Sequence, residues 1–321
     1  MDTTAVAVAF VGGVGRSGST LLCRMLHRVP SCIHVGEVCY LWRRGILENL
    51  PCSCGEPFLD CPFWTEVGQV GFGGWDQVDA ARAERQRRSF SARGELFRAA
   101  TGRASGRPED LAAYTGLNRT LFRAVREVSG CSVIVDNSKV ASEAYLRLQT
   151  DGLDTKVVHL VRDSRGVTHS RSKEVPREDI ENRQMARVPP GKSVARWLIF
   201  NALLTAICRR SGDRMLLRYE DFVADPDTQF RRVVRFLGIA VEPAGLSFLH
   251  DDEVELVGDH GIWGNPMRLR MGTQRIRLDE EWRSKMSTTT KAEVTAASLP
   301  GLLRYGYLGR RSPAAQKSRS T

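Results

Sequence analysis

Short apolar runs alternate with longer amphipathic segments along the chain, and this pattern predicts strands that alternate with helices. Residues 5–11 form an apolar run that ends at Gly12 and Gly13, as expected of a buried strand. Residues 19–29 follow with leucine, methionine and valine at helical spacing, and Pro30 ends the segment. The chain is therefore expected to open with a strand, a glycine-rich turn and a helix, which form the first half of a βαβ unit.

Three further apolar runs predict strands at residues 132–135, 156–161 and 214–219. Helical patterns precede the second and third of these runs, around residues 140–149 and 193–210. Strands that alternate with helices favour an α/β fold in three layers, with a central parallel sheet between helices. Because ligands of such sheets bind at the carboxyl ends of the strands, the polar segments after three of these strands are expected to converge at one edge.

The remaining segments predict a single domain with insertions. Residues 65–130 include a stretch rich in arginine and alanine and predict a helical insertion, with a loop near residues 102–108. Residues 173–192 are charged, contain three prolines and lack periodicity, which predicts a mobile loop. Residues 309–321 are basic and rich in serine, so we expect a disordered tail. No linker-like stretch divides residues 1–308, which we assign to one domain.

Composition and charge narrow the classes of partner. The 321 residues are 42% hydrophobic, which is enough apolar material for a sizeable core. The net charge of +10 favours anionic partners, without choosing among nucleotides, nucleic acid and acidic membranes. No run approaches the ~20 apolar residues of a membrane span, and the first apolar run follows Asp2 rather than a basic segment. We therefore expect a soluble, cytoplasmic protein without a transmembrane segment or signal peptide.

The predicted first turn has the composition of a phosphate-binding loop. Residues 13–20, Gly-Val-Gly-Arg-Ser-Gly-Ser-Thr, nearly match the P-loop form G-x-x-x-x-G-K-[ST]. Glycines let successive backbone N–H groups point at an anion, and the next helix adds the positive end of its dipole. Ser19 occupies the lysine position, and the basic residue is Arg16. Because nucleoside triphosphatases use that lysine on the phosphates and a hydroxyl on Mg²⁺, this loop suits a less charged ligand without a metal.

Two segments resemble the donor site of sulfotransferases. Residues 14–22, Val-Gly-Arg-Ser-Gly-Ser-Thr-Leu-Leu, resemble the 5′-phosphosulfate loop of the family, particularly of its bacterial, Golgi-type and tyrosylprotein members. Residues 158–170 resemble the family's 3′-phosphate segment, in which an arginine at a strand end and a serine eight positions later hold the phosphate. Arg162 and Ser170 have this spacing. Either motif alone would be moderate support, and both in the same order are strong.

The resemblance implies a P-loop-containing enzyme that moves a sulfuryl group from 3′-phosphoadenosine 5′-phosphosulfate (PAPS) to an acceptor hydroxyl by in-line displacement. The product of the donor would be 3′,5′-adenosine bisphosphate. The resemblance assigns the 3′-phosphate to Arg162 and Ser170. It assigns the 5′ end of PAPS to Arg16, Ser17, Gly18, Ser19, Thr20 and Leu21.

The C-terminal third extends the resemblance. Residues 260–268 and 276–283 are similar to the part of many sulfotransferases that folds over the cofactor. One of the arginines there is expected to be a second 3′-phosphate ligand, although exposed arginine is the more common alternative. The candidates are Arg268, Arg275 and Arg277, of which we take Arg277 forward.

Sulfuryl transfer needs a base for the acceptor proton and a cation for the leaving phosphate. Arg16 can serve as the cation. Lys139 follows a predicted strand and resembles a catalytic lysine of tyrosylprotein sulfotransferases, with a solvated lysine as the alternative. Glu37 resembles their catalytic glutamate in order and spacing, with a helix cap or structural ion pair as the alternative. Cytosolic sulfotransferases place a histidine after the strand that ends here in residues 136–138, where this chain has none.

Other polar residues are weaker candidates. His34 and His169 are further possible bases, and His159 is better explained as a core histidine because it falls inside a predicted strand. Asn201 falls on the apolar face of a predicted helix, where a buried amide more often bonds to the backbone than to an acceptor.

A cluster of cysteines raises the question of a metal. Cys52, Cys54 and Cys61 have the spacing C-x-C-x₆-C and could supply three zinc ligands, with Cys39 or His34 as a fourth. Structural zinc normally takes four ligands. Because the fourth is uncertain, we favour a cysteine-bearing loop and predict no bound metal. We expect no structural disulfide in a cytosolic chain.

Two other function classes compete with the sulfotransferase. A P-loop kinase or nucleotide hydrolase could use residues 133–136, Val-Ile-Val-Asp, as its metal-binding strand, but the missing loop lysine counts against it. A basic nucleic-acid-binding protein lacks support, because no recognised nucleic-acid module is present. The acceptor is expected to be a sugar, a glycolipid or a small metabolite, and the sequence leaves both its identity and the oligomeric state open.

Overall fold

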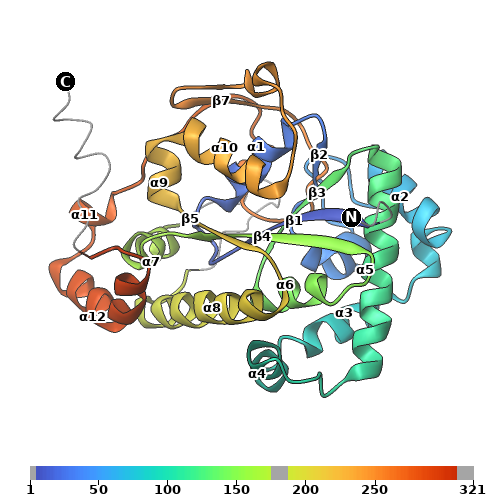
Figure 1. Cartoon of the computed structure of the whole chain (residues 1–321), viewed down its shortest axis with the longest axis horizontal. Helices are drawn as coiled ribbons and strands as arrows, with labels where there is room; N and C mark the ends of the chain where they lie inside the picture. Colours follow the sequence, from blue (N-terminus) through green and yellow to red (C-terminus); the bar gives the residue numbers. More distant parts are fainter. Residues whose placement is uncertain (1–4, 175–186, 309–321) are drawn as a thin grey trace.

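A parallel sheet of five strands lies between two layers of helices (Figure 1). The structure is a computed structural model, and it describes residues 5–174 and 187–308. The strand order is β2-β3-β1-β4-β5. The strands are β1 (Val6–Gly12), β2 (Cys32–His34), β3 (Val133–Lys139), β4 (Leu153–Val161) and β5 (Arg214–Arg218). The predicted α/β fold with a central parallel sheet is confirmed.

The side chains of the central strand β1 alternate between two cores. Val8 and Phe10 pack on the side of α6 (Ala141–Leu148) and α8 (Pro190–Ser211). Ala9 and Val11 pack on the opposite side, against α1 (Ser19–His27) and α10 (Pro226–Leu237). Figure 1 shows the two helix layers above and below the sheet. A strand buried on both faces accounts for its continuous apolar run.

The segment between β2 and β3 is largely helical. Between α4 and α5 the chain runs through residues 102–107, where the sequence predicts a loop. α2 packs along α5, the long green helix at the side of the sheet in Figure 1. The helices are η1 (Val38–Tyr40), η2 (Leu41–Leu47), α2 (Pro62–Phe72), η3 (Trp75–Gln77), α3 (Ala80–Ser89), α4 (Arg93–Thr101) and α5 (Pro108–Ser129).

The C-terminal third adds a small antiparallel sheet of order β6-β7-β8, which the sequence patterns did not predict. Its strands are two to four residues long, too short to show a period. The strands are β6 (Leu249–His250), β7 (Glu253–Leu256) and β8 (Gly272–Arg275). The remaining helices are α7 (Ser164–Ser172), α9 (Tyr219–Ala224), η4 (Pro243–Leu246), η5 (Pro266–Leu269), α11 (Trp282–Lys285) and α12 (Thr288–Arg304).

Two predicted segments fall wholly or partly beyond the described residues. The predicted mobile loop, residues 173–192, is described only at its ends, and its last three residues belong to α8, which begins at Pro190. The predicted disordered tail, residues 309–321, lies outside the described residues. Within the described part of the chain, no helix combines the length and the apolar character needed to cross a membrane.

Candidate active site

The carboxyl ends of β1, β3 and β4 meet at one edge of the sheet, where the glycine-rich loop begins. Gly12 is in register with Lys139 on one side and His159 on the other. The backbone N–H of Gly13 donates to the carbonyl of Lys139 at 3.0 Å. Gly13 has a φ of 145°, and a Cβ there would overlap the carbonyl oxygen of Leu160, so the position requires glycine. The predicted convergence of polar segments at this edge is confirmed.

The loop leads into the start of α1, where the first backbone N–H groups have no partner within the helix. Gly18 precedes the helix with a φ of 87°, and no side chain caps this end. The first backbone N–H groups of a helix lack partners within it, so they are available to an anion. Ser17 is 1% exposed, and its Oγ has no hydrogen-bond partner within the described residues. A buried hydroxyl without a partner is unusual, and a bound anion at this loop would supply one.

A cavity of about 660 Å³ opens beside this loop. Most of the residues predicted to bind the donor or act in catalysis contribute to its wall. They are Arg16, Gly18, Ser19, Thr20, Leu21, Glu37, Lys139 and Ser170. Ser17, Arg162 and Arg277 were also predicted, and none of the three lines the cavity.

The two predicted donor-binding segments are in direct contact. Arg16 Nε donates to Ser170 Oγ at 2.9 Å, and Arg162 Nη1 donates to the carbonyl of Arg16 at 3.0 Å. Burial, and secondarily the positive charge of Arg162, lowers the pKa of Arg16, and Asp279 opposes this shift. The loop therefore contacts Arg162, just before α7, and Ser170, in the last turn of α7.

Arg162 lies behind the loop. Its Nη2 is 3.0 Å from Asp279 Oδ2 and donates to the backbone carbonyl of the same residue at 2.8 Å. Its guanidinium also lies over the ring of Tyr219, 4.5 Å from the centroid. In this structure Arg162 supports the loop backbone, and its role as a 3′-phosphate ligand stays a prediction.

Glu37 and Lys139 form an ion pair on the cavity wall. Their side chains are 11% and 13% exposed, so the pair is shielded but reachable. Glu37 lies just before η1, where its backbone N–H donates to the carbonyl of Ile262 at 2.8 Å. Lys139 is the last residue of β3. The predicted catalytic pair is thus brought together from elements about a hundred residues apart, as the hydrogen bond between the two side chains shows.

A chain of hydrogen bonds holds both partners in place. Asp136 accepts from the backbone N–H of Ser138 at 2.8 Å, and Ser138 Oγ accepts from the backbone N–H of Cys39 at 3.0 Å. Cys39 follows Glu37 by two residues, and Ser138 precedes Lys139. The end of β3 is therefore fastened to the segment that carries the carboxylate.

Unusual backbone conformations concentrate at this cavity. Five non-glycine residues of the described chain have positive φ, and three of them line the cavity. These are Arg16 (79°), Lys139 (69°) and Trp263 (51°). Such conformations are costly for residues with a Cβ and cluster at functional sites.

The sequence did not single out two further arginines of the cavity wall. Arg171 and Arg196 both line the cavity. Within the described residues, Nε and Nη1 of Arg171 have no hydrogen-bond partner. Burial, followed by the charges of Arg196 and Arg16, lowers the pKa of Arg171. The available sequence signal was that Arg171 directly follows Ser170, a predicted phosphate ligand.

The C-terminal arginines lie elsewhere. Arg277 lines a separate cavity with Asp225 and Asp252. Arg275 forms an ion pair with Asp252 at 2.6 Å. Arg268 is buried and donates to the carbonyl oxygens of residues 51 and 261. None of the three candidates for a second 3′-phosphate ligand lines the cavity of the loop.

The weaker candidates also lie outside the cavity wall. His159 Nε2 is 2.9 Å from Asn201 Oδ1, and Asn201 Nδ2 donates to the carbonyl of Trp197 at 2.8 Å. Burial lowers the pKa of His159 to about 4 despite the hydrogen bond with Asn201. His34 Nδ1 is 2.9 Å from Asp259, and His169 Nε2 is 3.8 Å from Glu281. His159 and Asn201 are thus core residues, as the sequence favoured.

The carboxylate that a kinase would need for Mg²⁺ is buried in the core and already paired. Asp136 is fully buried, and its Oδ2 is 3.0 Å from Nε of Arg147, which is equally buried. Its Oδ1 accepts hydrogen bonds from Ser138. With both oxygens engaged and no exposure, Asp136 has no free ligand atom for Mg²⁺.

A known protein family matches most of the chain. The sequence profile described as Sulfotransferase family (Sulfotransfer_3) matches residues 9–243. A comparison with curated proteins gives no match. Among solved structures, the sulfotransferase domain from the curacin biosynthetic pathway is 18% identical, with a TM-score of 0.49. That alignment covers 92% of this chain and 98% of that domain.

Two further solved structures are similar. The sulfotransferase domain of the olefin synthase of Synechococcus PCC 7002 is 19% identical with a TM-score of 0.48, over 92% of this chain and 96% of that one. The sulfotransferase STF1 of Mycobacterium tuberculosis H37Rv is 16% identical with a TM-score of 0.41, over 76% and 70% of the two chains. Because the family profile spans most of the chain, including the loop at the sheet edge, this protein belongs to the sulfotransferase family.

Proposed function

We propose that this enzyme transfers a sulfuryl group from PAPS to a hydroxyl group of a sugar, a glycolipid or a small metabolite. The observation that carries the proposal is the contact between the two predicted donor-binding segments, in which Arg16 Nε donates to Ser170 Oγ at 2.9 Å. Since an anion-binding loop and a second basic segment border one cleft, a single nucleotide with a phosphosulfate at one end and a phosphate at the other suits them.

The chemistry of the cleft fits such a donor. Ser17 Oγ and two nitrogen atoms of Arg171 are buried without partners in the described part of the chain, and the start of α1 is uncapped. All of these groups can donate hydrogen bonds to an anion. Residues 13–20 lack the lysine that P-loop triphosphatases use, and Asp136 has no free oxygen for Mg²⁺. These features support an adenosine phosphosulfate over ATP–Mg²⁺ and count against a kinase.

When bound, the donor supplies an activated sulfuryl group, whose transfer breaks the S–O bond to the 5′-phosphate as a bond from the acceptor oxygen to sulfur forms. In this proposal Glu37 accepts the proton of the acceptor hydroxyl. Lys139 holds the carboxylate of Glu37 through their ion pair and adds positive charge beside it. The electron pair of the broken bond goes to the phosphate, where Arg16 and the N-terminal end of α1 stabilise the charge.

Three aromatic side chains of the cavity wall indicate what kind of acceptor would fit. Tyr40, Phe200 and Trp263 line the cavity, and the rings of Tyr40 and Trp263 lie 6.0 Å apart. Aromatic side chains present apolar faces to ring-shaped or lipid-like ligands. We therefore propose an acceptor that carries its hydroxyl on an apolar or ring-shaped body.

Two measurements test the proposal. Saturating 3′,5′-adenosine bisphosphate is expected to raise the melting temperature, because a ligand that binds only the folded protein stabilises it. ATP with Mg²⁺ is expected to leave the melting temperature unchanged. In a mass-spectrometric screen of pooled hydroxyl acceptors with labelled PAPS, Glu37→Gln is expected to lower the turnover of any positive acceptor about 10²- to 10⁴-fold.

The controls separate binding from chemistry. Glu37→Gln should still be stabilised by adenosine bisphosphate, and Arg16→Ala should lose most of this stabilisation. Arg231→Gln is the matched control, because Arg231 is exposed and pairs with Asp227 on α10, away from the cavity. Stabilisation by ATP–Mg²⁺ alone would contradict the proposal and favour a kinase.

A further inference from the structure

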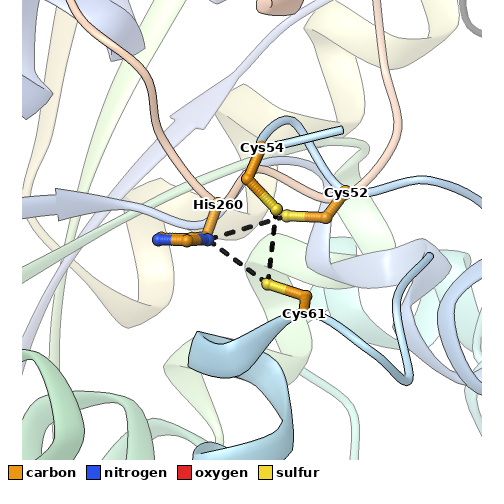
Figure 2. Close-up of side chains that lie close together, drawn as sticks. All are labelled: Cys52, Cys54, Cys61 and His260. Atoms are coloured by element: carbon orange, nitrogen blue, oxygen red, sulfur yellow. Dashed lines mark hydrogen bonds between the residues drawn. The ribbon is translucent and has the colours of Figure 1, made fainter. Parts of the chain in front are cut away.

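Three cysteines and one histidine from distant parts of the sequence meet outside the candidate active site. Their side chains point toward one another (Figure 2). The cluster comprises Cys52, Cys54, Cys61 and His260, and their sulfur and nitrogen atoms all lie within 4.8 Å of one another. We call this group the Cys₃His cluster. Within the described residues it is the group of side chains best suited to hold a metal ion.

The fourth member of the cluster corrects the sequence analysis. Cys39 and His34 were the candidates, but His34 Nδ1 is 2.9 Å from Asp259 and Cys39 Sγ contacts the carbonyl of Ser138. His260 takes the place instead, from a segment that follows β7. About two hundred residues separate His260 from the cysteines, as its contact with Cys61 shows, so no local spacing could have indicated it.

Three separations within the cluster come close to the edges of a tetrahedron around zinc, and all lie within 4.8 Å. Cys61 Sγ lies 3.3 Å and Cys52 Sγ lies 3.9 Å from His260 Nδ1, and Cys54 Sγ lies 3.6 Å from Cys61 Sγ. Zinc bonds of about 2.3 Å to sulfur and about 2.0 Å to nitrogen put tetrahedral ligand atoms about 3.5–3.8 Å apart. A disulfide would need its sulfur atoms at about 2.05 Å, so the three thiols are free.

The surroundings fix each ligand atom in its place. The backbone N–H of Cys52 donates to the carbonyl of Glu56 at 2.9 Å, and that of Gly55 donates to the carbonyl of Cys52 at 3.0 Å. The backbone N–H of Cys61 donates to the carbonyl of Pro57 at 2.9 Å. These hydrogen bonds fix the turns that carry the three sulfur atoms.

The imidazole of the cluster is oriented as well. The ring of His260 stacks on Phe63, with centroids 4.9 Å apart and planes at 17°. Trp64 Nε1 donates to the backbone carbonyl of His260 at 2.8 Å. The Nδ1 atom is therefore held facing the thiols before any ion is bound, as a preformed site requires.

We propose that the Cys₃His cluster binds one zinc ion in a closed, tetrahedral structural site. Thiolate and imidazole donors suit zinc, and four protein ligands leave no position for a catalytic water. None of the four residues lines the active-site cavity, which agrees with a structural role. On binding, the three thiols lose their protons to solvent as the sulfur–zinc bonds form.

The zinc ion clamps the wall of the active site. His260 begins the segment that runs through Ile262 to Trp263, and Trp263 lines the cavity. Ile262 forms β-bridges with Gly36 and with Cys52, itself a member of the cluster. The carbonyl of Ile262 accepts from the backbone N–H of Glu37 at 2.8 Å. The ion thus ties Cys52 and the segment that positions Glu37 into one unit, which makes it a positioning element for the proposed reaction.

The ion itself is tested on the untagged wild-type chain expressed with zinc in the medium. Elemental analysis is expected to give one zinc ion per chain. Zinc K-edge X-ray absorption is expected to show three sulfur atoms at about 2.3 Å and one nitrogen atom. Folded protein that contains no zinc would overturn the proposal, and so would a first shell made only of oxygen and nitrogen atoms.

A ligand variant locates the site. Cys54 is the exposed member of the cluster, so Cys54→Ser disturbs the packing least, and Cys131→Ser removes a partly buried cysteine outside the cluster. In a chelator competition, Cys54→Ser is expected to bind zinc about 10- to 100-fold or more weakly, while Cys131→Ser matches the wild type. The cobalt-substituted proteins should differ in the same way in their thiolate charge-transfer absorption. Equal zinc affinity of the two variants would overturn the site.

The clamping effect rests on the proposed role of Glu37, but the metal site does not. If the wild type holds zinc with three sulfur ligands while Glu37→Gln remains active, the proposed chemistry fails and the zinc site stands. If Glu37→Gln loses activity and the wild type holds no zinc, the proposed chemistry stands and the zinc site fails. Chelation of the wild type should also speed proteolysis within residues 51–61, because the loop then loses its clamp.

Discussion

At the residue scale, Arg171 is a partly buried cation with two nitrogen atoms that have no partner among the described residues. Its Nε and Nη1 have no hydrogen-bond partner within the described chain, and the positive charges of Arg196 and Arg16 add to burial in lowering its pKa. Removing a charged group from water without a partner is unfavourable. A bound anionic ligand offsets that cost, so Arg171 is expected to contribute to donor affinity alongside Ser170.

Replacement of this side chain by a neutral one tests that expectation. Arg171→Gln should weaken the binding of 3′,5′-adenosine bisphosphate about 10- to 100-fold, because a hydrogen bond to a charged group contributes about 1.5–3 kcal/mol. Isothermal titration calorimetry gives the affinity directly. Arg231→Gln serves again as the matched change at an exposed site. Unchanged affinity of Arg171→Gln would show that the side chain faces the acceptor or solvent instead.

Prediction from sequence succeeded at this scale where the signal was local. The turn at residues 13–20 between β1 and α1 was predicted because it is a contiguous run of backbone, and its binding of phosphate stays a prediction. The pairing of Glu37 with Lys139 was expected only through the family resemblance, since no period or spacing links two residues on different elements. Arg171 and His260 were missed because long side chains reach sites from positions that their local sequence does not mark.

At the element scale, the end of β3 is anchored by a buried network of charges. Asp136 on β3 pairs with Arg147 on α6 at 3.0 Å, and Arg147 lies 3.5 Å from Glu143. All three side chains are fully buried. Since Asp136 also holds Ser138, next to Lys139, the network links the packing of α6 to the position of the ion pair at the cavity.

Breaking this network is expected to be costly. Arg147→Met leaves Asp136 buried without its cation and Glu143 paired only with Arg87, and this should lower the free energy of unfolding by about 3–5 kcal/mol. Urea denaturation followed by circular dichroism measures the change. The matched substitution Arg231→Met breaks an exposed pair and should cost less than about 1 kcal/mol. A similar fall in the free energy of unfolding in both variants would mean that other groups compensate the buried charges.

Long strands were predicted more accurately than short ones. The buried run that became β1 was found within one residue at each end, because a buried strand shows as a continuous apolar run, whereas β4 begins three residues before its predicted start. β2 and the sheet β6-β7-β8 were missed, because strands of two to four residues carry no readable period. Their pairing is decided by tertiary contacts instead.

At the scale of the whole molecule, the core contains a histidine that the fold keeps neutral. His159 on β4 is fully buried between Asn201 and Arg214. Burial lowers its pKa to about 4 in the folded protein, from an ordinary value of 6.5. Above pH 6.5 neither the folded nor the unfolded chain protonates it. Between pH 6.5 and 4 the unfolded chain binds a proton that the folded chain does not, so acidification favours unfolding.

The free energy of unfolding should therefore fall between pH 6.5 and 4, with His159 contributing up to about 1.4 kcal/mol per pH unit. Urea denaturation at several pH values measures the slope. His159→Gln should flatten the slope by up to one proton, whatever its effect on stability at pH 7. The exposed His250, changed to Gln, should leave the slope as it is. A slope unaffected by His159→Gln would place the titrating group elsewhere.

The positive backbone angles at Arg16, Lys139 and Trp263 bear on how this enzyme can be engineered. Glycine would relieve roughly 1–2 kcal/mol at each of these positions, since only glycine adopts the left-handed region freely. A selection for heat resistance alone would therefore favour removal of the side chains that line the cavity. Variants improved in that way should be screened for turnover in parallel, because thermal tolerance and catalysis make opposite demands on these three residues.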